Sequence, residues 1–477
     1  MQITTREFLQ KLGLVSGGLV SGAAFGDEFV AARDKLPPGS CGDPDNVWFG
    51  KNIFPLPHTI EDGPSAEIRG GKIVCPAREI PLFHETDVLV VGGGPAGFAA
   101  AVAARRSGAR VALIERYGSL GGLFTNGLVL KVLATGQALG AGRWRLVTRG
   151  LCEEFMNRAA ALADVASTPK VDATRNHWQP DIDAEAAKYL MDRMVVEAGV
   201  ELFFHSWCVD TIQEGDRVRG VLFESKQGKQ AILARQIVDC TGDADVAFLA
   251  GCDYRQITHG IGHVVQLGNM DRITATDYPA TDGAGEKLEG PWPFRSNEGN
   301  KSLWWGNYGT GPKGNGLDVR DLTNAELEFR KYWWEHVQKM RRTEGWKEVY
   351  LANTCSQIGP RATRLIAAEK VVDRASIRAC NHFDDTIAVM GATGRHNQVE
   401  VPYGQLVPTK GENILCAGRM LGAPDTCDQF RLIAPCFVTG EAAGTAAALC
   451  VAKGVSPRKL DTTLLRKTLQ EKNAWVG

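Results

Sequence analysis

The sequence predicts an α/β fold with a second, α+β domain inserted into it. Residues 87–115 show the pattern strand, helix, strand, and the first strand runs into a cluster of glycines. Apolar strand patterns of the same kind continue to residue 238 and return at residue 398, whereas residues 260–399 have a different, tryptophan-rich composition. The domain that holds the sheet is therefore predicted to be discontinuous in sequence.

Composition limits the classes of protein that the chain can represent. The chain has 477 residues, of which 44% are hydrophobic and 23% charged, with a net charge of −1. These values are ordinary for a globular protein of one large or two medium domains, and they argue against a nucleic-acid surface. No apolar run reaches the roughly 18 residues of a membrane span. The 12 cysteines form no C-x-x-C pair, so no metal site is predicted.

The first 84 residues differ from the rest of the chain. Residues 1–26 have the layout of an export signal, because Arg6 and Lys11 precede a mildly apolar stretch. Residues 4–10 resemble a degenerate twin-arginine signal, with Thr5 where the first arginine belongs, which predicts a periplasmic or secreted protein. The alternative is a frayed N-terminal helix on a cytoplasmic protein. Residues 27–84, rich in proline and glycine from residue 36 on, are predicted to be a leader that wraps the surface.

The strand–helix–strand unit begins at Asp87. Residues 87–91 form an apolar strand, an alanine-rich helix runs to residue 106, and residues 111–114 form a second buried strand. Gly92, Gly94 and Gly97 give the pattern G-x-G-x-x-G, and Glu115 stands 23 positions after the first glycine. This combination is typical of a Rossmann-like, dinucleotide-binding βαβ unit.

Each part of this unit has a mechanical reason. Gly92 allows a tight turn, Gly94 lets the backbone approach a pyrophosphate, and Gly97 lets the helix pack closely on the strand. The N-terminus of the helix carries about half an elementary positive charge, which suits a diphosphate. Glu115 can accept both ribose hydroxyls of an adenosine and would repel a 2′-phosphate, so an NADP site is disfavoured.

Two further segments are predicted to present backbone to a ligand. Residues 116–127 hold several glycines directly after Glu115, and residues 239–245 close a buried strand with the sequence D-C-T-G-D-A-D. The alternatives are a flexible surface loop for the first segment and a simple helix cap for the second.

The remaining elements follow from periodicity. Helices are predicted at residues 146–162, 183–198, 323–340, 361–377 and 435–451, and strands at 200–205, 209–212, 218–224, 231–238, 398–407 and 413–416. The sheet domain is predicted to comprise residues 85–260 and 400–477, and the inserted substrate or cap domain residues 261–399. His259 and His263 are four residues apart, but glycines 260 and 262 argue against a helical metal pair. The tryptophans of the insert either stack on a ring of the substrate or form core, and core is favoured for Trp333 and Trp334.

Several motifs carry a resemblance to one family. They are VVGGGPAG at residues 90–97 with IER at 114–116, LGG at 120–122, VDCTGDADVA at 238–247, and the segments VPYGQLVP, ENILCAGR and TGEAAGTAAA between 401 and 448. A weaker motif is GPRATR at 359–364. With them the chain resembles FAD-dependent oxidoreductases of glutathione-reductase-like fold that carry a "xanthan lyase" label.

The resemblance implies a tightly bound FAD. The glycines of the turn would hold the pyrophosphate, Glu115 the ribose, and Arg116 and the Cys208 backbone the adenine. The helix from Gly440 would direct its N-terminus at the flavin pyrimidine ring. The implied binding residues are Gly92, Gly94, Pro95, Ala96, Gly97, Glu115, Arg116, Gly121, Gly122, Thr125, Cys208, Gly242, Asp243, Gly418, Arg419 and Gly440.

The expected function is that of an FAD-dependent oxidoreductase. Hydride would pass between a small, hydroxylated or carbohydrate-like substrate and flavin N5. His396 and Asp425 are the catalytic candidates, although Asp425 stands where the family has a histidine, so the family's acid–base chemistry need not apply; Asp428, Arg361 and Arg364 are further polar candidates. The alternatives are an FAD-dependent reductase of an unsaturated substrate, a flavin protein that catalyses a non-redox isomerisation, and an NAD enzyme. The sequence specifies neither the electron acceptor nor the oligomeric state.

Overall fold

The computed structural model describes residues 65–140, 143–162, 171–172, 177–178, 182–274, 295–297, 300–307, 313–391 and 398–477. Residues 65–477 form one compact unit. The predicted export signal and residues 27–64 of the predicted leader lie outside the described residues. The rest of the leader begins with a hairpin of β1 (Glu67–Arg69) and β2 (Lys72–Val74).

A seven-stranded sheet forms the centre of this unit. Its order is β10-β11-β12-β3-β4-β9, and β24 also pairs with β12. Strands β12, β3, β4 and β9 run parallel, as does β24 beside β12, whereas β10 and β11 continue the sheet antiparallel. The bounds are β3 Leu82–Val91, β4 Val111–Ile114, β9 Glu201–Phe203, β10 Trp207–Glu214, β11 Arg217–Ser225, β12 Gly228–Asp239 and β24 Ile414–Cys416. Because β24 comes from the C-terminal part of the chain, the sheet is discontinuous in sequence, as predicted.

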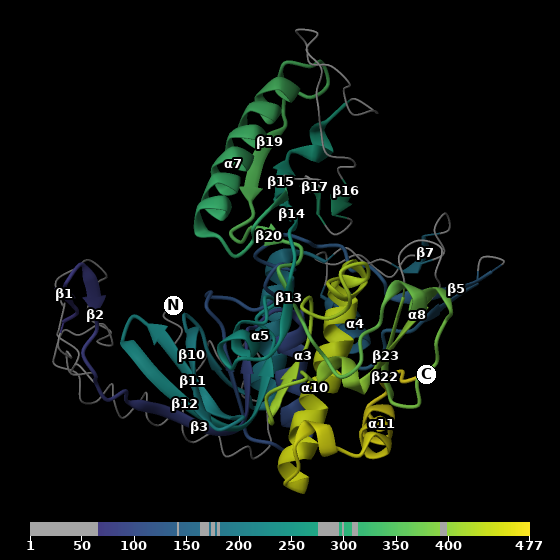
Figure 1. Ribbon diagram of the computed structural model, residues 1–477. Coiled ribbons are helices and arrows are strands. Elements are labelled where there is room, and N and C mark those ends of the chain that lie inside the picture. The colour runs from purple at the N-terminus through teal and green to yellow at the C-terminus, as the bar shows by residue number, and fades with distance from the viewer. Residues whose placement is uncertain are drawn as a thin grey trace, which may run out of the picture. The chain divides into compact units, whose positions relative to one another are not determined.

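Helices α3 (Pro95–Arg106) and α10 (Ile433–Lys453) pack against each other beside this sheet (Figure 1). Both are rich in alanine and glycine, so their backbones approach closely. A Cβ atom on Gly444 would overlap the carbonyl oxygen of Ala100, and the rings of Phe98 and Phe437 meet edge to face at 5.6 Å. Small residues in α10 therefore set the distance between the two helices.

Helix α10 is also long and apolar enough to cross a membrane, with a mean hydropathy of 1.3 over its most apolar window. In the structure 94% of that window is buried within the protein. Burial against the sheet and α3 accounts for the composition of α10, as it does for core helices generally.

A second, smaller hydrophobic cluster lies in the inserted region. Its sheet has the order β16-β17-β15-β19, and helix α7 (Val319–Arg341) packs against β19 (Figure 1). Trp333 is fully buried in this cluster, whereas the side chain of Trp334 is 60% exposed. The strands of the four-stranded sheet are β15 Val264–Gly268, β16 Arg295–Asn297, β17 Asn300–Asn307 and β19 Tyr350–Thr354. A separate sheet of the inserted region is formed by β14 His259–Gly262, β18 Lys313–Gly314 and β20 Gly359–Pro360.

The members of the second cluster run from Ile261 to Ile358, while Ile366, Met390 and Val399 pack in the main cluster. An α+β insertion is thus present. The predicted limits 261–399 stay a prediction, since residues near their end share the main core.

Four predicted elements differ from the structure. The strand predicted at 398–407 ends at Pro402, because residues 403–406 form a 3₁₀ helix. The helix predicted at 361–377 is wrong, because Arg364–Ile366 forms β21, which pairs with β13 (Tyr254–Gln256), and only α8 (Arg374–Arg378) is helical. This pairing joins segments about a hundred residues apart and outweighs local periodicity. Residues 143–146 form β6, so the helix predicted from residue 146 begins at Leu151. The N-cap of α7 is Asp318, whose side chain accepts from two backbone N–H groups, so the helix predicted from residue 323 begins at Val319.

The other elements confirm their sequence patterns or are short. Helix α5 ends at Ala198, as predicted; Asp183 caps its start, and Gly199 follows its end in the left-handed conformation. The remaining bounds are α4 Leu151–Ala160, α5 Ala184–Ala198, α6 Asp245–Leu249, α9 Cys427–Phe430, α11 Thr462–Glu471, β5 Gly136–Gly140, β6 Arg143–Leu146, β7 Val171–Asp172, β8 His177–Trp178, β22 Thr386–Gly391, β23 Gln398–Pro402, and the 3₁₀ helices η1 Met270–Arg272, η2 Tyr403–Leu406 and η3 Pro457–Lys459.

Candidate functional site

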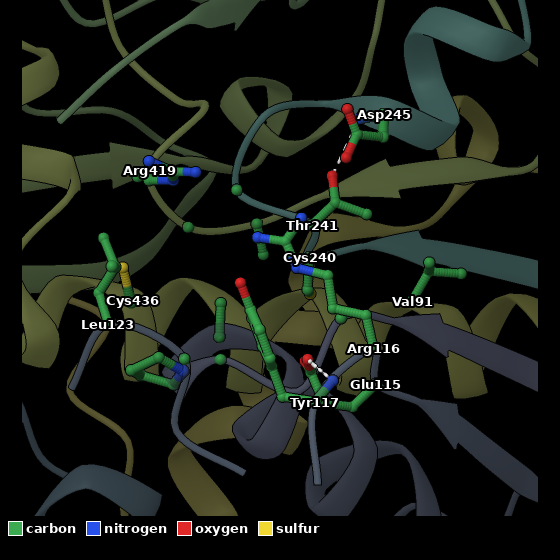
Figure 2. Close-up of a pocket in the computed structure, with 18 of the residues that line it drawn as sticks. Val91, Glu115, Arg116, Tyr117, Leu123, Cys240, Thr241, Asp245, Arg419 and Cys436 are labelled. Carbon is green, nitrogen blue, oxygen red and sulfur yellow. Dashed lines mark hydrogen bonds between the residues drawn. The ribbon is translucent and has the colours of Figure 1, made fainter. Parts of the chain in front are cut away.

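A cavity lies at the carboxyl ends of four parallel strands. Val91 and Ile114 end β3 and β4, and Cys240 and Ala417 directly follow β12 and β24; all four line the cavity. Ligands of open parallel sheets bind at this edge. Figure 2 shows the side chains that surround the cavity.

Most of the residues predicted to bind a dinucleotide line this cavity. They are Gly92, Gly94, Pro95, Ala96, Glu115, Arg116, Gly122, Cys208, Gly242, Gly418 and Arg419. They come from five separate stretches of the chain, which the fold brings together.

The three glycines of the G-x-G-x-x-G turn have three different surroundings. A Cβ atom on Gly92, whose φ is +96°, would overlap the backbone of Cys240 at the end of β12. A Cβ atom on Gly97 would overlap the carbonyl oxygen of Gly92, so this residue keeps α3 close to β3. A Cβ atom on Gly94 would meet nothing within 4 Å, and Gly94 lines the cavity. The turn is therefore packed on the protein side and open on the cavity side.

Glu115 is oriented by two backbone N–H groups. Its Oε2 accepts from Gly93 at 2.6 Å. Its Oε1 accepts from Tyr117 at 2.9 Å (Figure 2). Burial raises the pKa of the Glu115 carboxyl, against the opposing effect of these two hydrogen bonds and the charge of Arg116. A buried carboxylate fixed in this way retains lone pairs that can accept from a hydroxyl of a bound ligand.

Arg116 lies beside two aromatic rings at one end of the cavity. Its guanidinium carbon is 4.9 Å from the ring centroid of Tyr117 and 5.3 Å from that of Trp207. All three side chains line the cavity, and Trp207 is 56% exposed. A guanidinium plane and aromatic faces form a stacking surface for a flat ring such as adenine.

Asp239 builds the turn after β12. Its fully buried carboxylate accepts from the backbone N–H and the hydroxyl of Thr241, and from the backbone N–H of Ala247. Burial raises the pKa of Asp239 to about 6, although these hydrogen bonds act in the opposite direction. The Thr241 hydroxyl in turn accepts from the N–H of Asp245 (Figure 2). Asp239 thereby fixes the backbone that Thr241 and Gly242 present to the cavity.

Asp243 lies behind the cavity and not in its lining. Its carboxylate accepts from Arg419 at 2.6 Å and from the Thr363 hydroxyl at 2.5 Å. Arg419 also donates to the carbonyl of Pro360 and itself lines the cavity. Asp243 therefore orients Arg419, which differs from the direct cofactor contact expected for it.

Gly440 is not at a helix N-terminus. Helix α10 begins at Ile433, so Gly440 is its eighth residue, and a Cβ atom there would overlap the backbone of Ala96 in α3. The helix does reach the cavity with its N-terminus, but through Ile433 and Cys436. The role of Gly440 is helix packing. The helix N-terminus was predicted at Gly440 but lies about two turns earlier, at Ile433, where no glycine is needed.

Gly97, Gly121 and Thr125 likewise stay outside the lining. Thr125 is fully buried and its hydroxyl donates to the carbonyl of Leu120 at 2.5 Å, while a Cβ atom on Gly121 would overlap the Thr125 side chain. These contacts shape the loop whose Leu123 and Phe124 line the cavity.

The two catalytic candidates have different outcomes. His396 lies outside the described residues. Asp425 is not in the cavity lining; its half-exposed side chain faces Arg374 at 3.8 Å. Cys240 and Cys436 do line the cavity, but burial raises the pKa of both thiols, that of Cys436 to about 12, so neither is a thiolate at neutral pH.

Sequence reasoning missed residues that only the tertiary fold brings to the cavity. Gln357 arrives from the inserted region and Arg431 from the segment before α10. In the part of the chain that the structure describes, the buried Oε1 of Gln357 and the buried Nδ2 of Asn126 have no hydrogen-bond partner. The backbone N–H of Gln357 donates to the backbone carbonyl of Asn126 at 3.2 Å, so the two residues are neighbours, and Gln357 lines the cavity. Unpartnered buried amides beside a cavity indicate that a polar ligand completes them.

These features fit a dinucleotide. The cavity offers a glycine turn open to a pyrophosphate, an oriented carboxylate for a ribose, a stacking surface for adenine and the positive end of α10 at its other side.

Short parts of the chain are similar to curated proteins. A sarcosine oxidase subunit alpha from Corynebacterium sp. strain U-96 is 45% identical over 69 residues, which cover 13% of this chain and 7% of that protein. A dihydrolipoyl dehydrogenase from Trypanosoma brucei brucei is 47% identical over 49 residues, or 10% of each chain. The matched segments thus span 10% or less of the length of these two relatives.

Solved structures are similar over a larger part of the chain. A geranylgeranyl bacteriochlorophyll reductase-like protein from Thermoplasma acidophilum has a TM-score of 0.43 and 15% identity, over 82% of this chain and 84% of that one. A p-nitrophenol 4-monooxygenase from Pseudomonas putida DLL-E4 has a TM-score of 0.42 and 13% identity, over 82% and 89%.

The model of one family matches residues 87–469, described as FAD dependent oxidoreductase. This range runs from the first strand of the βαβ unit into α11, and it contains the glycine turn, Glu115, the Asp239 turn and α10. The resident cofactor is therefore FAD, and the cavity has the features that FAD requires. This chain belongs to the FAD-dependent oxidoreductase family.

Proposed function

We propose that this protein oxidises a small, hydroxylated organic molecule of carbohydrate-like character, with hydride passing from a substrate carbon to flavin N5. When bound, FAD supplies the two-electron acceptor for this chemistry. The residues of the chain hold the nucleotide half at the glycine turn and receive the substrate at the end of the cavity near α10.

The N-terminus of α10 favours electron flow from the substrate to the flavin. Ile433, the first residue of this 21-residue helix, lines the cavity, and Arg431 lines it two positions earlier. A helix N-terminus carries about half an elementary positive charge, and Arg431, although paired with Asp428, places its guanidinium at the same end of the cavity. Positive charge beside the ring system of the cofactor stabilises the electrons that it gains, so this end of the cavity favours oxidation of the substrate.

The test is an anaerobic screen in which oxidised holoenzyme is mixed with candidate alcohols and sugars. We expect one class of hydroxylated compound to bleach the visible absorbance of the bound flavin. Bleaching by none of them, together with recolouring of chemically reduced enzyme by unsaturated compounds, would support a reductase instead. Accumulation of product while the absorbance stays unchanged would support a non-redox isomerisation.

A further inference from the structure

Three side chains meet at the edge of the cavity near α10, away from the glycine turn. Arg431 Nε donates to Asp428 Oδ1 at 2.5 Å, and His259 Nε2 lies 3.4 Å from Asp428 Oδ2. Arg431 lines the cavity. His259 is the first residue of β14 in the inserted region, whereas Asp428 belongs to α9. One carboxylate therefore links the C-terminal segment to the inserted region beside the cavity.

Hydrogen bonds fix the orientation of this group. The backbone N–H of Gly260 donates to His259 Nδ1 at 2.7 Å, which assigns the imidazole proton to Nε2, the atom that faces Asp428. Burial opposes ionisation of Asp428, but Arg431 and His259 outweigh it and hold the pKa of this carboxyl below its ordinary value. Asp428 is therefore a carboxylate at neutral pH, and it holds Arg431 through Nε.

The terminal nitrogens of Arg431 are left for a ligand. Among the described residues, the Arg431 side chain donates one hydrogen bond, from Nε to Asp428, so Nη1 and Nη2 have no protein acceptor there. The Arg431 side chain is only 25% exposed. A guanidinium group that is held on one edge and free on the other presents two parallel donors, the geometry that a carboxylate or phosphate fits.

The charge of Arg361 adds to the positive potential around Arg431. Its backbone N–H donates to the carbonyl of Gly260, next to His259. Burial lowers the pKa of Arg361, and the charge of Arg431 lowers it further, whereas Asp428 acts in the opposite direction. The two guanidinium groups thus repel each other in a partly buried place, and an incoming anion relieves that repulsion.

We propose that Arg431, held by Asp428 and His259 and supported by the charge of Arg361, binds an anionic oxygen group of the substrate, either a carboxylate or a phosphate monoester. The substrate class is then a hydroxylated organic acid or its phosphate-bearing counterpart. This assignment rests on the proposed function, because it treats the anion as part of the molecule that is oxidised. The alternative is that Arg431 and Asp428 form an ordinary surface ion pair. Such a pair would not line a cavity and would not hold the Nη1 and Nη2 donors toward it.

The test uses the full-length, oxidised holoenzyme and redox-inert probes. Acetate, inorganic phosphate and the uncharged acetamide are titrated at constant ionic strength by calorimetry, with the visible spectrum of the bound flavin as a second readout. We expect acetate or phosphate to bind at least about tenfold more tightly than acetamide and to perturb the flavin spectrum. Tighter binding of acetate indicates a carboxylate substrate, and tighter binding of phosphate indicates a phosphate ester.

Variants assign the binding to Arg431. We expect Arg431→Gln to weaken anion binding about 10- to 100-fold, and Arg431→Lys to restore part of it, since lysine keeps the charge but not the fork. Arg219→Gln removes the same charge from the 52%-exposed Arg219 side chain on β11 and should leave binding unchanged. Equal binding of acetate and acetamide, an unaffected Arg431→Gln variant, or loss of FAD from that variant would each overturn the assignment.

The outcomes also separate this inference from the proposed function. Anion binding is measured without turnover, whereas the proposed function is tested by bleaching. An enzyme that is bleached by uncharged alcohols and ignores both anions would retain the function and lose the anion site. An enzyme that binds anions through Arg431 but is bleached by no hydroxylated compound would retain the site and lose the function.

Discussion

At the scale of single residues, the cavity depends on a few buried carboxylates that have different tasks. Glu115 faces the cavity and holds its own position through two backbone N–H groups. Asp239 is fully buried and organises a turn, while Asp243 orients Arg419. A carboxylate that touches a ligand and one that shapes the backbone look alike in sequence. They are told apart by which atoms their oxygens accept from.

The role of Glu115 leads to a direct prediction. Glu115→Gln keeps the size of the side chain but removes a charged acceptor, so it should weaken both the backbone contacts and a ribose contact. We expect the dissociation constant for FAD to rise about 10- to 100-fold, since hydrogen bonds to charged groups contribute roughly 1.5–3 kcal/mol. Equilibrium dialysis measures this constant. Glu344→Gln, at a position whose side chain is 87% exposed, is the matched control. Unchanged FAD affinity in Glu115→Gln would contradict the assignment.

The buried tryptophan of the insert supplies a second test at this scale. Trp333 and Trp334 are neighbours in α7, but Trp333 is fully buried and Trp334 is 60% exposed. We expect Trp333→Ala to lower the free energy of unfolding by about 3–5 kcal/mol, and Trp334→Ala to change it by less than about 0.5 kcal/mol. Chemical denaturation of both variants checks this. Similar losses in the two would mean that Trp334 is covered in solution.

At the scale of elements, the contact between α3 and α10 is the one on which the cavity most depends. Gly444 faces Ala100 across this contact, and the N-terminus of α10 lines the cavity. Gly444→Val should push the helices apart and cost about 1–3 kcal/mol of unfolding free energy, with weaker FAD retention. Ala452→Val places a larger side chain on the exposed end of the same helix and should be nearly neutral. Thermal unfolding and the flavin content of the purified variants report both effects.

Glu441 joins two helices and makes stability depend on pH. It lies in α10, and its Oε2 accepts from Leu151 N–H at the start of α4 at 2.9 Å. Burial raises the pKa of Glu441 to about 7, while the Leu151 hydrogen bond and the charges of Lys472 and Arg106 oppose that rise. The folded protein therefore keeps a proton that the unfolded chain releases above about pH 4.5, so this group makes stability fall as pH rises from about 4.5 to 7.

We expect Glu441→Gln to remove that part of the pH dependence. Relative to the unsubstituted protein, the variant should gain stability between about pH 5 and pH 8, by up to about 3 kcal/mol. Denaturant unfolding at both pH values measures the difference. A second, smaller hollow is lined by Glu441 and by Glu153 of α4. Glu153→Gln is the control, and its pH dependence should match that of the unsubstituted protein. A Glu441→Gln curve parallel to the original one would show that Glu441 is already ionised when folded.

The elements also show how far the sequence predicts the fold. The βαβ unit is predicted correctly because its strand, glycine turn and helix lie within thirty residues and each signal is local. The helix expected at 361–377 fails because β21 pairs with β13, a partner that no local pattern reveals. Gln357 and Arg431 were not predicted as cavity residues for the same reason. The glycines of α10 correctly predicted close helix packing. They did not predict that the helix reaches the cavity through Ile433 and Cys436.

At the scale of the whole molecule, the cavity connects two hydrophobic clusters. Its lining takes the glycine turn from the main cluster and Gln357 from the inserted region, whose own cluster is centred on Trp333. Two further contacts cross between them near the cavity, from Arg419 to the Pro360 carbonyl and between His259 and Asp428. A ligand in the cavity therefore touches both parts of the compact unit.

This arrangement predicts that FAD stabilises both parts together. A ligand that binds only the folded protein adds about 2.7 kcal/mol at a free concentration of one hundred times its dissociation constant. Hydrogen exchange of the apo and FAD-loaded protein should thus show slower exchange at two places far apart in sequence. They are the turn after β3 and the segment between β19 and β20, where Gln357 N–H bonds to the Asn126 carbonyl. Exchange at the surface of α7, which lines no part of the cavity, should stay the same. Protection confined to the glycine turn would mean that FAD leaves the inserted region untouched, and that the substrate, and not the cofactor, completes the Gln357 amide.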